Sequence, residues 1–266
     1  MGDGWQSLVR IAALDVLSQY PQEAATRVVL LFEEPESFLH PHLSRKLRGV
    51  LERLAAAGWV VVLTTHSPNL VSFSCNQSIV RLTRNADTVT ARFLRAIEVD
   101  GAAKFQERLD ERGSHEMLFA QKVVLCEGQD DVFAIRSYLQ KRCDVDLDGR
   151  SVSIIRAGDV GQLSAFASIA SKLGIPWCAV SDEDLLPDGT TKSVTAEARS
   201  RLKALQSPTD CQVQWPQDLE ACLRKSPGKA TPNWQSQHIE TKSTDDLKND
   251  NPNYITACEA IRTWAT

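Results

Sequence analysis

Three short apolar runs that end in acidic residues constrain the fold of this chain more than any other feature. They are VVLLFEE at residues 28–34, KVVLCEG at 122–128 and PWCAVSDED at 176–184. Each is long enough for one buried strand, and helical patterns separate them, which is typical of α/β folds with mainly parallel sheets. Ligands of such sheets bind outside the carboxyl ends of the strands. The sequence therefore predicts acidic sites at sheet edges.

Length and composition favour two globular domains. The chain has 266 residues, 42% hydrophobic and 24% charged, and we place a boundary near residue 115, giving domains 1–115 and 116–266. The net charge of −4 excludes a uniformly basic nucleic-acid coat but allows a local basic patch. Seven cysteines without a CxxC pair argue against a zinc site and indicate a reducing cytoplasm. No apolar run is long enough to span a membrane.

Periodicity predicts the order of helices and strands. In the first domain we expect helices over 7–19 and 43–58, buried strands over 27–32 and 59–65, and a hairpin turning at 84–87. In the second domain we expect strands at 122–128, 152–158, 176–184 and 211–215, with helices at 130–142, 162–174, 195–205 and from 216. The Pro-, Ser-, Asn- and Asp-rich segment 226–252 is expected to form long loops, before a closing helix over 255–264.

The first acidic run and the strand after it carry elements of a nucleotide site. Glu33 stands where P-loop ATPases keep the acid that orders Mg²⁺, and Glu34 where a second acid polarises water. His66, in TTHSP, can sense a γ-phosphate. These motifs, with GDGWQSLVRIAAL at 2–14, resemble the Walker B, D-loop, switch histidine and signature of ABC-type ATPases of the DNA-repair and SMC kind.

The phosphate-binding loop of such ATPases is missing from the sequence. The pattern G-x-x-x-x-G-K-[ST] does not occur, and the only Gly-Lys pair, at 228–229, is followed by alanine. We therefore expect the chain to be the C-terminal part of a longer protein. It should not hydrolyse ATP alone, and ATP would be a cofactor of the full-length protein only.

The two later acidic runs predict a metal site. Glu127 follows one buried strand, Asp131 lies at the start of the next helix, and Asp182 and Asp184 end another strand. Adjacent parallel strands would bring these carboxylates together, and they repel one another unless cations lie between them. Oxygen-only ligation favours Mg²⁺ or Mn²⁺, and two such ions can clamp the attacking and leaving oxygens of a phosphodiester.

The order strand-Glu-Gly, helix, strand, helix, strand-Asp-x-Asp resembles the Toprim domain of topoisomerases, primases and OLD (overcoming lysogenization defect) nucleases. VLCEGQDDVFAI is most similar to the OLD version, where an acid four residues after the glutamate also binds metal, as Asp131 would. The resemblance implies that Glu220 in WPQDLEACL reaches back to the metals. It also implies a phosphate-stabilising lysine farther on; Lys229, just past Glu220, is the first candidate and Lys242 the second. Asp159 is a weaker candidate ligand.

An ABC-type ATPase followed by Toprim is the domain order of OLD nucleases. The resemblance implies an α/β protein with a partial ATPase lobe, a Rossmann-like parallel Toprim sheet flanked by helices, and a C-terminal helical or loop extension. It implies a metal-dependent DNA endonuclease that self-associates through its ATPase domain. A helicase-like partner remains open.

The segment 191–205 carries four basic residues and one acid, and it directly follows the Asp-x-Asp strand. Arg199, Arg201 and Lys203 are therefore predicted to contact DNA phosphates. One alternative function is an ATP-regulated clamp in which Toprim grips DNA without cutting. Another is topoisomerase-type cleavage, which needs a nucleophilic tyrosine; the three tyrosines are Tyr20, Tyr138 and Tyr254.

Overall fold

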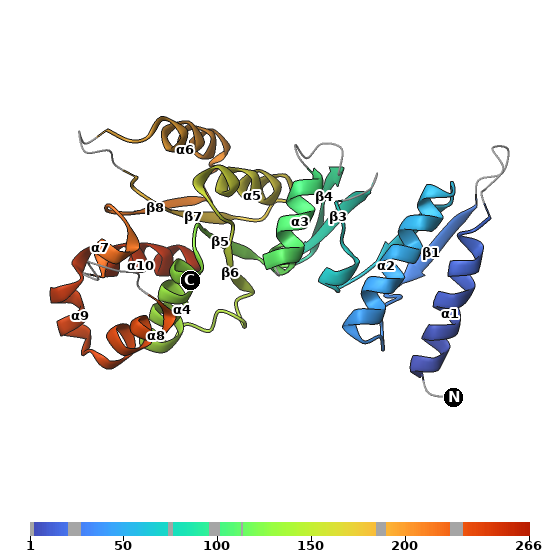
Figure 1. The fold of residues 1–266 in the computed structure, drawn as a ribbon, viewed down its shortest axis with the longest axis horizontal. Coiled ribbons are helices and arrows are strands. Elements are labelled where there is room, and N and C mark those ends of the chain that lie inside the picture. Colours follow the sequence, from blue (N-terminus) through green and yellow to red (C-terminus); the bar gives the residue numbers. More distant parts are fainter. Residues whose placement is uncertain are drawn as a thin grey trace. The chain divides into compact units, whose positions relative to one another are not determined.

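The computed structural model describes residues 3–20, 28–73, 77–95, 102–112, 114–184, 190–223 and 231–266. The chain separates into two compact units (Figure 1). The first unit comprises Met1–Ile79 and Arg95–Glu111, and the second comprises Val80–Leu94 and Arg112–Thr266. The division after Glu111 lies near the boundary expected at residue 115, which as a domain limit stays a prediction. Among these described ranges, no helix combines the length and apolarity needed to cross a lipid bilayer.

The first unit is built on two parallel strands that alternate with helices. Its elements are α1 (Asp3–Leu17), β1 (Val29–Glu33), α2 (Pro41–Ala56), β2 (Val60–Thr64), the 3-10 turn η1 (Pro68–Leu70) and most of α3 (Ala102–Arg112). The strands pair in register, with Glu33 opposite Thr64. Helix α2 ends as the sequence predicts, since Gly58 follows its last turn with a φ of 92°, which favours glycine.

The prediction that β1 and β2 are fully buried is wrong within the described residues. Both strands alternate between exposed and half-buried positions, and the side chain of Leu31 is 73% exposed. One face of the pair, including Phe32 and Leu63, packs against a core centred on α2, with Leu47 and Val50. In the described part of the unit, α1 and α2 supply the core on that face only, so the residues of the opposite face stay accessible.

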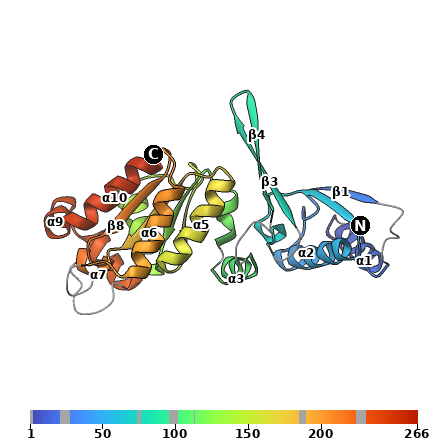
Figure 2. The same ribbon diagram turned by 90° about the horizontal axis from the view of Figure 1, so that it is seen from above.

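The hairpin predicted around residues 84–87 is present and belongs to the second unit. It consists of β3 (Ser78–Asn85) and β4 (Thr88–Arg95), and Ala86 in the turn has a φ of 48° (Figure 2). Arg81 fastens it to the unit by donating hydrogen bonds to the backbone oxygens of Ala120 and Leu173, at 2.7 and 3.3 Å.

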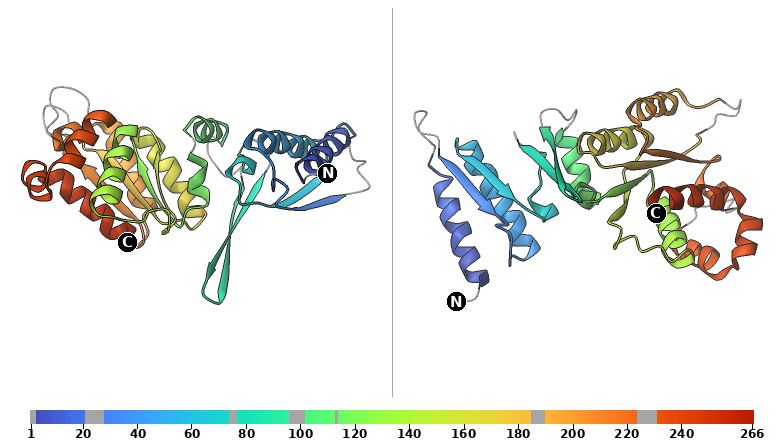
Figure 3. Two further views of the ribbon diagram at one scale, coloured as in Figure 1. Left: turned by 90° about the horizontal axis from the view of Figure 1, so that it is seen from below. Right: turned by 180° about the vertical axis from the view of Figure 1, so that it is seen from behind.

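A four-stranded parallel sheet in the order β6-β5-β7-β8 forms the centre of the second unit. Figures 2 and 3 show α5 and α6 on one face of this sheet, and α4 and α10 on the other. The main elements are β5 (Lys122–Cys126), α4 (Gln129–Arg136), β6 (Val152–Arg156), α5 (Val160–Lys172), β7 (Trp177–Asp182), α6 (Ser193–Leu205), β8 (Cys211–Trp215), α7 (Leu219–Cys222) and α10 (Pro252–Ala265). Shorter turns are η3 (Ser114–Leu118) and the π-helical η4 (Ser137–Arg142), which extends α4.

The fold class and the strands and helices predicted for this unit are therefore confirmed up to residue 223. The strands are short apolar runs because helices cover both faces of the sheet; Val124, Leu125 and Cys126 of β5 are all fully buried. The α10 residues Tyr254 and Ile261 complete the core on one face.

The prediction of long loops over 226–252 is wrong for the described residues 231–252. They form α8 (Pro232–Gln235), η5 (Ser236–Glu240) and α9 (Thr244–Asp250). Ser243 begins α9 by accepting a hydrogen bond from the backbone N–H of Asp246 at 3.1 Å, as a helix N-cap does. Ile239 and Leu247 are buried, so single apolar anchors in a polar sequence fix these helices to the core.

Candidate metal centre

The carboxyl ends of β5 and β7 bring two of the predicted carboxylates side by side. The strands are parallel neighbours, and Cys126 pairs with Val180, so Glu127 and Asp182 leave the sheet at the same edge. A hollow of about 290 Å³ opens there. It is lined by Glu127, Gly128, Asp130, Asp131, Asp159, Asp182, Leu219 and Glu220.

Glu127 is the carboxylate with the strongest need for a positive partner. It accepts a hydrogen bond from the backbone of Asp182, but its Oε1 atom is buried and has no hydrogen-bond partner. Burial raises the pKa of Glu127 to about 8, with further contributions from the negative charges of Asp182, Asp131 and Asp184. A buried, unpaired carboxylate oxygen costs free energy unless a proton or a cation satisfies it.

Asp182 shares this environment. Its pKa is raised to about 7, and burial is the largest cause. The negative charge of Asp131 is the next largest, and Asp218, Asp184 and Glu220 contribute less. Near neutral pH the charged forms of Glu127 and Asp182 are therefore disfavoured together. A divalent cation in the hollow would reverse this, because it stabilises the ionised forms that bind it.

The carboxylate of Asp131 accepts two structural hydrogen bonds that the sequence analysis did not predict. Its Oδ2 accepts a hydrogen bond from the backbone N–H of Gly128 at 2.7 Å, which closes the first turn of α4. Its Oδ1 accepts a hydrogen bond from the indole N–H of the buried Trp215 at 2.9 Å. Burial nevertheless raises its pKa to about 6. The spacing of Gly128 and Asp131 is the signal that predicts such a helix cap.

Asp184 is not brought into the hollow. Its carboxylate lies toward the start of α6, where Thr195 Oγ1 donates to Oδ2 at 2.8 Å and Lys192 Nζ lies 3.0 Å from Oδ1. Burial acts to raise the pKa of Asp184, but the hydrogen bonds from Lys192 and Thr195 outweigh it and the pKa is lowered. Its backbone adopts a φ of 52°, which is uncommon for a non-glycine residue.

Of the remaining candidates, Glu220 does line the hollow, from the first turn of α7. Asp159 also lines it, but its side chain caps α5 by accepting a hydrogen bond from the backbone N–H of Gln162. Lys229 lies outside the described residues. Lys242 forms an ion pair with Asp250 at 2.5 Å.

Fully assembled ligand shells are not found among the residues that the structure describes. Within the described ranges, no group of three or more histidine, cysteine, aspartate or glutamate side chains is arranged closely enough to hold an ion. The chemistry of the hollow still fits a divalent cation, because its donors are carboxylate oxygens and Glu127 Oε1 is buried without a partner. The assignment of individual ligands stays a prediction.

Comparisons with known proteins match this part of the chain to one family. Residues 118–184, from η3 through β7, match the model "Overcoming lysogenization defect protein-like, TOPRIM domain". The second unit contains an OLD-like TOPRIM domain. Residues 1–72 match the model "AAA domain, putative AbiEii toxin, Type IV TA system". The resemblance predicted from the sequence is therefore confirmed for both parts.

Two curated relatives carry the same family name. The chain is 21% identical over 194 residues to the Old nuclease of Escherichia phage P2, and 26% identical over 196 residues to the OLD nuclease of Thermus scotoductus. Each match covers 70% of this chain, but only 33% and 36% of the relatives. The chain thus spans about a third of the length of the curated relatives it matches.

Solved structures of OLD proteins are also similar. The C-terminal region of the Burkholderia pseudomallei OLD protein matches with 13% identity and a TM-score of 0.36, over 56% of this chain and all of the other. The C-terminal region of the Xanthomonas campestris pv. campestris OLD protein matches with 16% identity and a TM-score of 0.28, over 56% of this chain and 83% of the other.

The basic helix α6 of the second unit is only partly free to meet DNA. Arg199 Nη2 donates a hydrogen bond to the backbone oxygen of Asp182, so this side chain holds the end of β7. Arg201 forms an ion pair with Glu197 at 2.6 Å, one turn earlier on the same helix. Lys203 is exposed. The prediction of DNA contacts stays untested for all three.

Two tyrosines of the second unit have structural hydrogen bonds. Tyr254 is fully buried, and its hydroxyl donates to the backbone oxygen of Ala134 at 2.8 Å. Tyr138 is buried and donates to Glu259 at 2.5 Å. Neither hydroxyl is among the atoms that line the acidic hollow. This arrangement gives no support to a tyrosine nucleophile from these two positions.

The predicted nucleotide residues of the first unit also meet at a sheet edge. His66 Nε2 lies 3.4 Å from Glu34 Oε1, although the histidine side chain is 87% exposed. Glu33 ends β1, and Glu34 follows it with a φ of 41°. Sequence reasoning missed Glu36, which accepts a hydrogen bond from Thr65 and keeps a buried Oε2 without a partner. The only sequence signal for Glu36 as a further acid of this site was its position two residues after Glu34.

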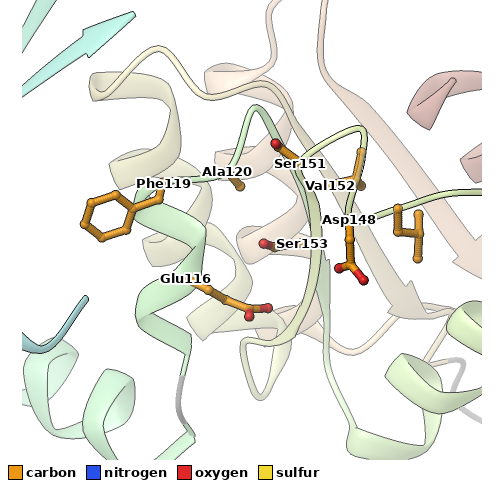
Figure 4. Close-up of a pocket in the computed structure, with 8 residues that line it drawn as sticks. Glu116, Phe119, Ala120, Asp148, Ser151, Val152 and Ser153 are labelled. Carbon is orange, nitrogen blue, oxygen red and sulfur yellow. The ribbon is translucent and has the colours of Figure 1, made fainter. Parts of the chain in front are cut away.

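A second hollow of about 200 Å³ lies beside the amino ends of β5 and β6, at the sheet edge opposite the acidic hollow (Figure 4). Its lining combines Phe119 and Val152 with the acids Glu116 and Asp148. No residue predicted to carry chemistry lines it. The acidic hollow is therefore the better candidate for a reactive centre.

Proposed function

We propose that the TOPRIM domain hydrolyses phosphodiester bonds of DNA with the help of divalent metal ions. The observation that carries the proposal is that Glu127 and Asp182 lie together at the carboxyl ends of β5 and β7, where both line an acidic hollow. The Oε1 atom of Glu127 is buried there without a hydrogen-bond partner. The names of the two nuclease relatives support the same function. The chain would then be part of a longer ATPase-nuclease of the OLD family.

The carboxylates would divide between two ions. Glu127 and Asp131 would hold one ion, and Asp182 would hold or bridge to a second together with Asp184. Glu220, which lines the hollow from α7, would complete the shell. Asp131 can contribute while keeping its hydrogen bonds to Gly128 and Trp215, because each carboxylate oxygen has two lone pairs and each bond occupies one.

Mg²⁺ or Mn²⁺ bound there would supply Lewis acidity, activating water and stabilising the departing 3′ oxygen. The residues of the chain do the remaining work. The rigid ends of β5 and β7 fix the positions of Glu127 and Asp182, and Arg199 holds the backbone of Asp182. By the family resemblance, Lys229 would stabilise the reacting phosphate as a positive point charge.

DNA would reach the site along α6. Lys203 is exposed there, and Arg201 could exchange its surface ion pair with Glu197 for a phosphate at little cost, since such pairs contribute about 0–1 kcal/mol. Self-association through the ATPase domain, a helicase-like partner and regulation by ATP would be properties of the full-length protein.

The test is incubation of supercoiled plasmid with the purified chain in Mg²⁺, in Mn²⁺ and in chelator. We expect nicking with either ion, at least as fast with Mn²⁺ because it tolerates looser geometry, and none in chelator. The variant Glu127→Gln should lose nicking. Glu240→Gln is its matched control and should keep nicking, since Glu240 is paired with Lys141 on the surface and does not line the hollow. Nicking that persists in chelator would refute metal dependence. Tight DNA binding without cleavage under any condition would favour the clamp.

A further inference from the structure

Of the two carboxylates of the Asp-x-Asp pair, only that of Asp184 has a positively charged side-chain partner among the described residues. Lys192 Nζ lies 3.0 Å from its Oδ1, and Thr195 donates to its Oδ2 at 2.8 Å. The two donors differ in accessibility: Thr195 is 3% exposed, whereas the Lys192 side chain is 54% exposed. One contact is therefore built into the fold, and the other can exchange with solvent.

The backbone keeps Lys192 beside Asp184 whatever its side chain does. The N–H of Lys192 donates to the backbone oxygen of Asp184 at 3.3 Å, and the oxygen of Lys192 accepts from the N–H of Ala196 at 2.9 Å. Moving the ammonium away thus requires rotation of a flexible side chain only, with no change in the start of α6. Lysine, with four rotatable side-chain bonds, is suited to such a movement.

The charge of Lys192 matters to the whole acidic hollow. Asp184 is outside the lining, yet its negative charge contributes to the unfavourable field at Glu127 and at Asp182. The ammonium of Lys192 offsets that charge at its source. In the metal-free chain, one of the predicted ligands therefore carries its own counter-cation.

We infer that Lys192 is the built-in counter-cation of Asp184 and competes with the second divalent ion for this carboxylate. The inference deepens the proposed function, on which it rests. An ion approaching Asp184 meets the positive charge of the Lys192 ammonium, so Lys192 must turn away before Asp184 can ligate. Thr195 keeps the other oxygen fixed during the exchange. Lys192 is thus a positioning residue that sets how tightly the second ion binds.

The test is a calorimetric titration of the full chain with MnCl₂ in the absence of DNA, so that the readout is ion affinity and not cleavage. Lys192→Met removes the charge but keeps most of the side-chain volume. We expect it to tighten binding of the weaker ion about thirtyfold, the effect in water of removing one unit charge about 4 Å from a divalent ion. Lys192→Arg keeps the charge and should bind Mn²⁺ like the unaltered chain.

Lys141→Met is the matched control, because Lys141 also forms an exposed lysine–carboxylate pair, with 57% of its side chain accessible, and lies outside the hollow. It should leave both affinities unchanged. Thermal melting of each variant checks that the fold is intact. Unchanged or weaker Mn²⁺ binding by Lys192→Met would overturn the role of Lys192 alone. No Mn²⁺ binding by the unaltered chain would overturn the proposed metal site, and this inference with it.

Discussion

The two units contain the same local pattern, a parallel strand that ends in an acid, in two different environments. In the first unit Glu34 lies at an accessible edge, 46% exposed and close to the exposed His66. In the second unit Glu127 leaves a strand buried on both faces and retains an oxygen with no partner. Because both faces of its sheet are covered, we expect Glu127 to depend more strongly on a cation than the accessible Glu34 does.

The largest effect should come from removing the buried carboxylates. Glu127→Gln and Asp182→Asn should each reduce plasmid nicking about a thousandfold or more, and the double variant should lose little further activity, because ligands of one centre act as a unit. Initial nicking rates in Mn²⁺ would measure this, with circular dichroism to verify folding. Multiplicative losses in the double variant would show that the two carboxylates act separately.

A smaller effect should follow from changing the support of Asp131. Trp215→Phe removes the indole donor to its Oδ1, and should lower the free energy of unfolding by about 2 kcal/mol or more, since hydrogen bonds to charged groups contribute about 1.5–3 kcal/mol. The matched control is Trp264→Phe, which removes an exposed indole bond to the oxygen of Thr209. Urea unfolding measures both. Equal losses in the two variants would mean that the bond to Asp131 is not special.

Glu127 should make the stability of the folded chain depend on pH. The folded-state pKa of Glu127 is raised from 4.5 to about 8, so the folded chain binds more protons than the unfolded chain between these values. In chelator, stability should therefore be fully present below about pH 4.5 and fall as the pH rises toward 8. A loss of 1 kcal/mol would appear as a decrease in melting temperature of about 2–4 °C.

Two changes isolate the cause of that slope. Glu127→Gln should reduce the fall in melting temperature between pH 5 and 8, because one of the three carboxylates with a raised pKa, beside Asp131 and Asp182, no longer releases a proton. In the unaltered chain, saturating Mn²⁺ should reduce the decrease in melting temperature with rising pH, because the ion stabilises the ionised carboxylates. A slope that is the same in Glu127→Gln and in the unaltered chain would place the titrating group elsewhere.

The smallest effect is expected at the exposed site. Glu34→Gln or His66→Ala should change the free energy of unfolding by less than about 1 kcal/mol, since both side chains are accessible. Neither should alter nicking by this chain. The chain alone should also show no ATP turnover, because it lacks the phosphate loop. ATP hydrolysis that disappears in Glu34→Gln would contradict this expectation.

Much of the second unit could be predicted because its signals are local. The apolar runs set β5, β6, β7 and β8, and the acids that follow β5 and β7 had to emerge at one edge once those strands were parallel neighbours. Less could be predicted where a polar sequence conceals a few anchors, as at Ile239 and Leu247 in the C-terminal helices. Contacts between distant residues, such as Trp215 with Asp131, leave no local pattern at all.

The sequence by itself determined which strands form, the acids that end them and the family they resemble, because hydrophobic periodicity and short motifs are properties of neighbouring residues. The tertiary structure decided what each carboxylate does. It left Oε1 of the half-buried Glu127 without a partner, engaged Asp131 in a helix cap, and turned Asp184 toward Lys192 and Thr195. The physical reason is that burial and partner distance set the energy of a charge, and both arise only when segments far apart in the chain pack together.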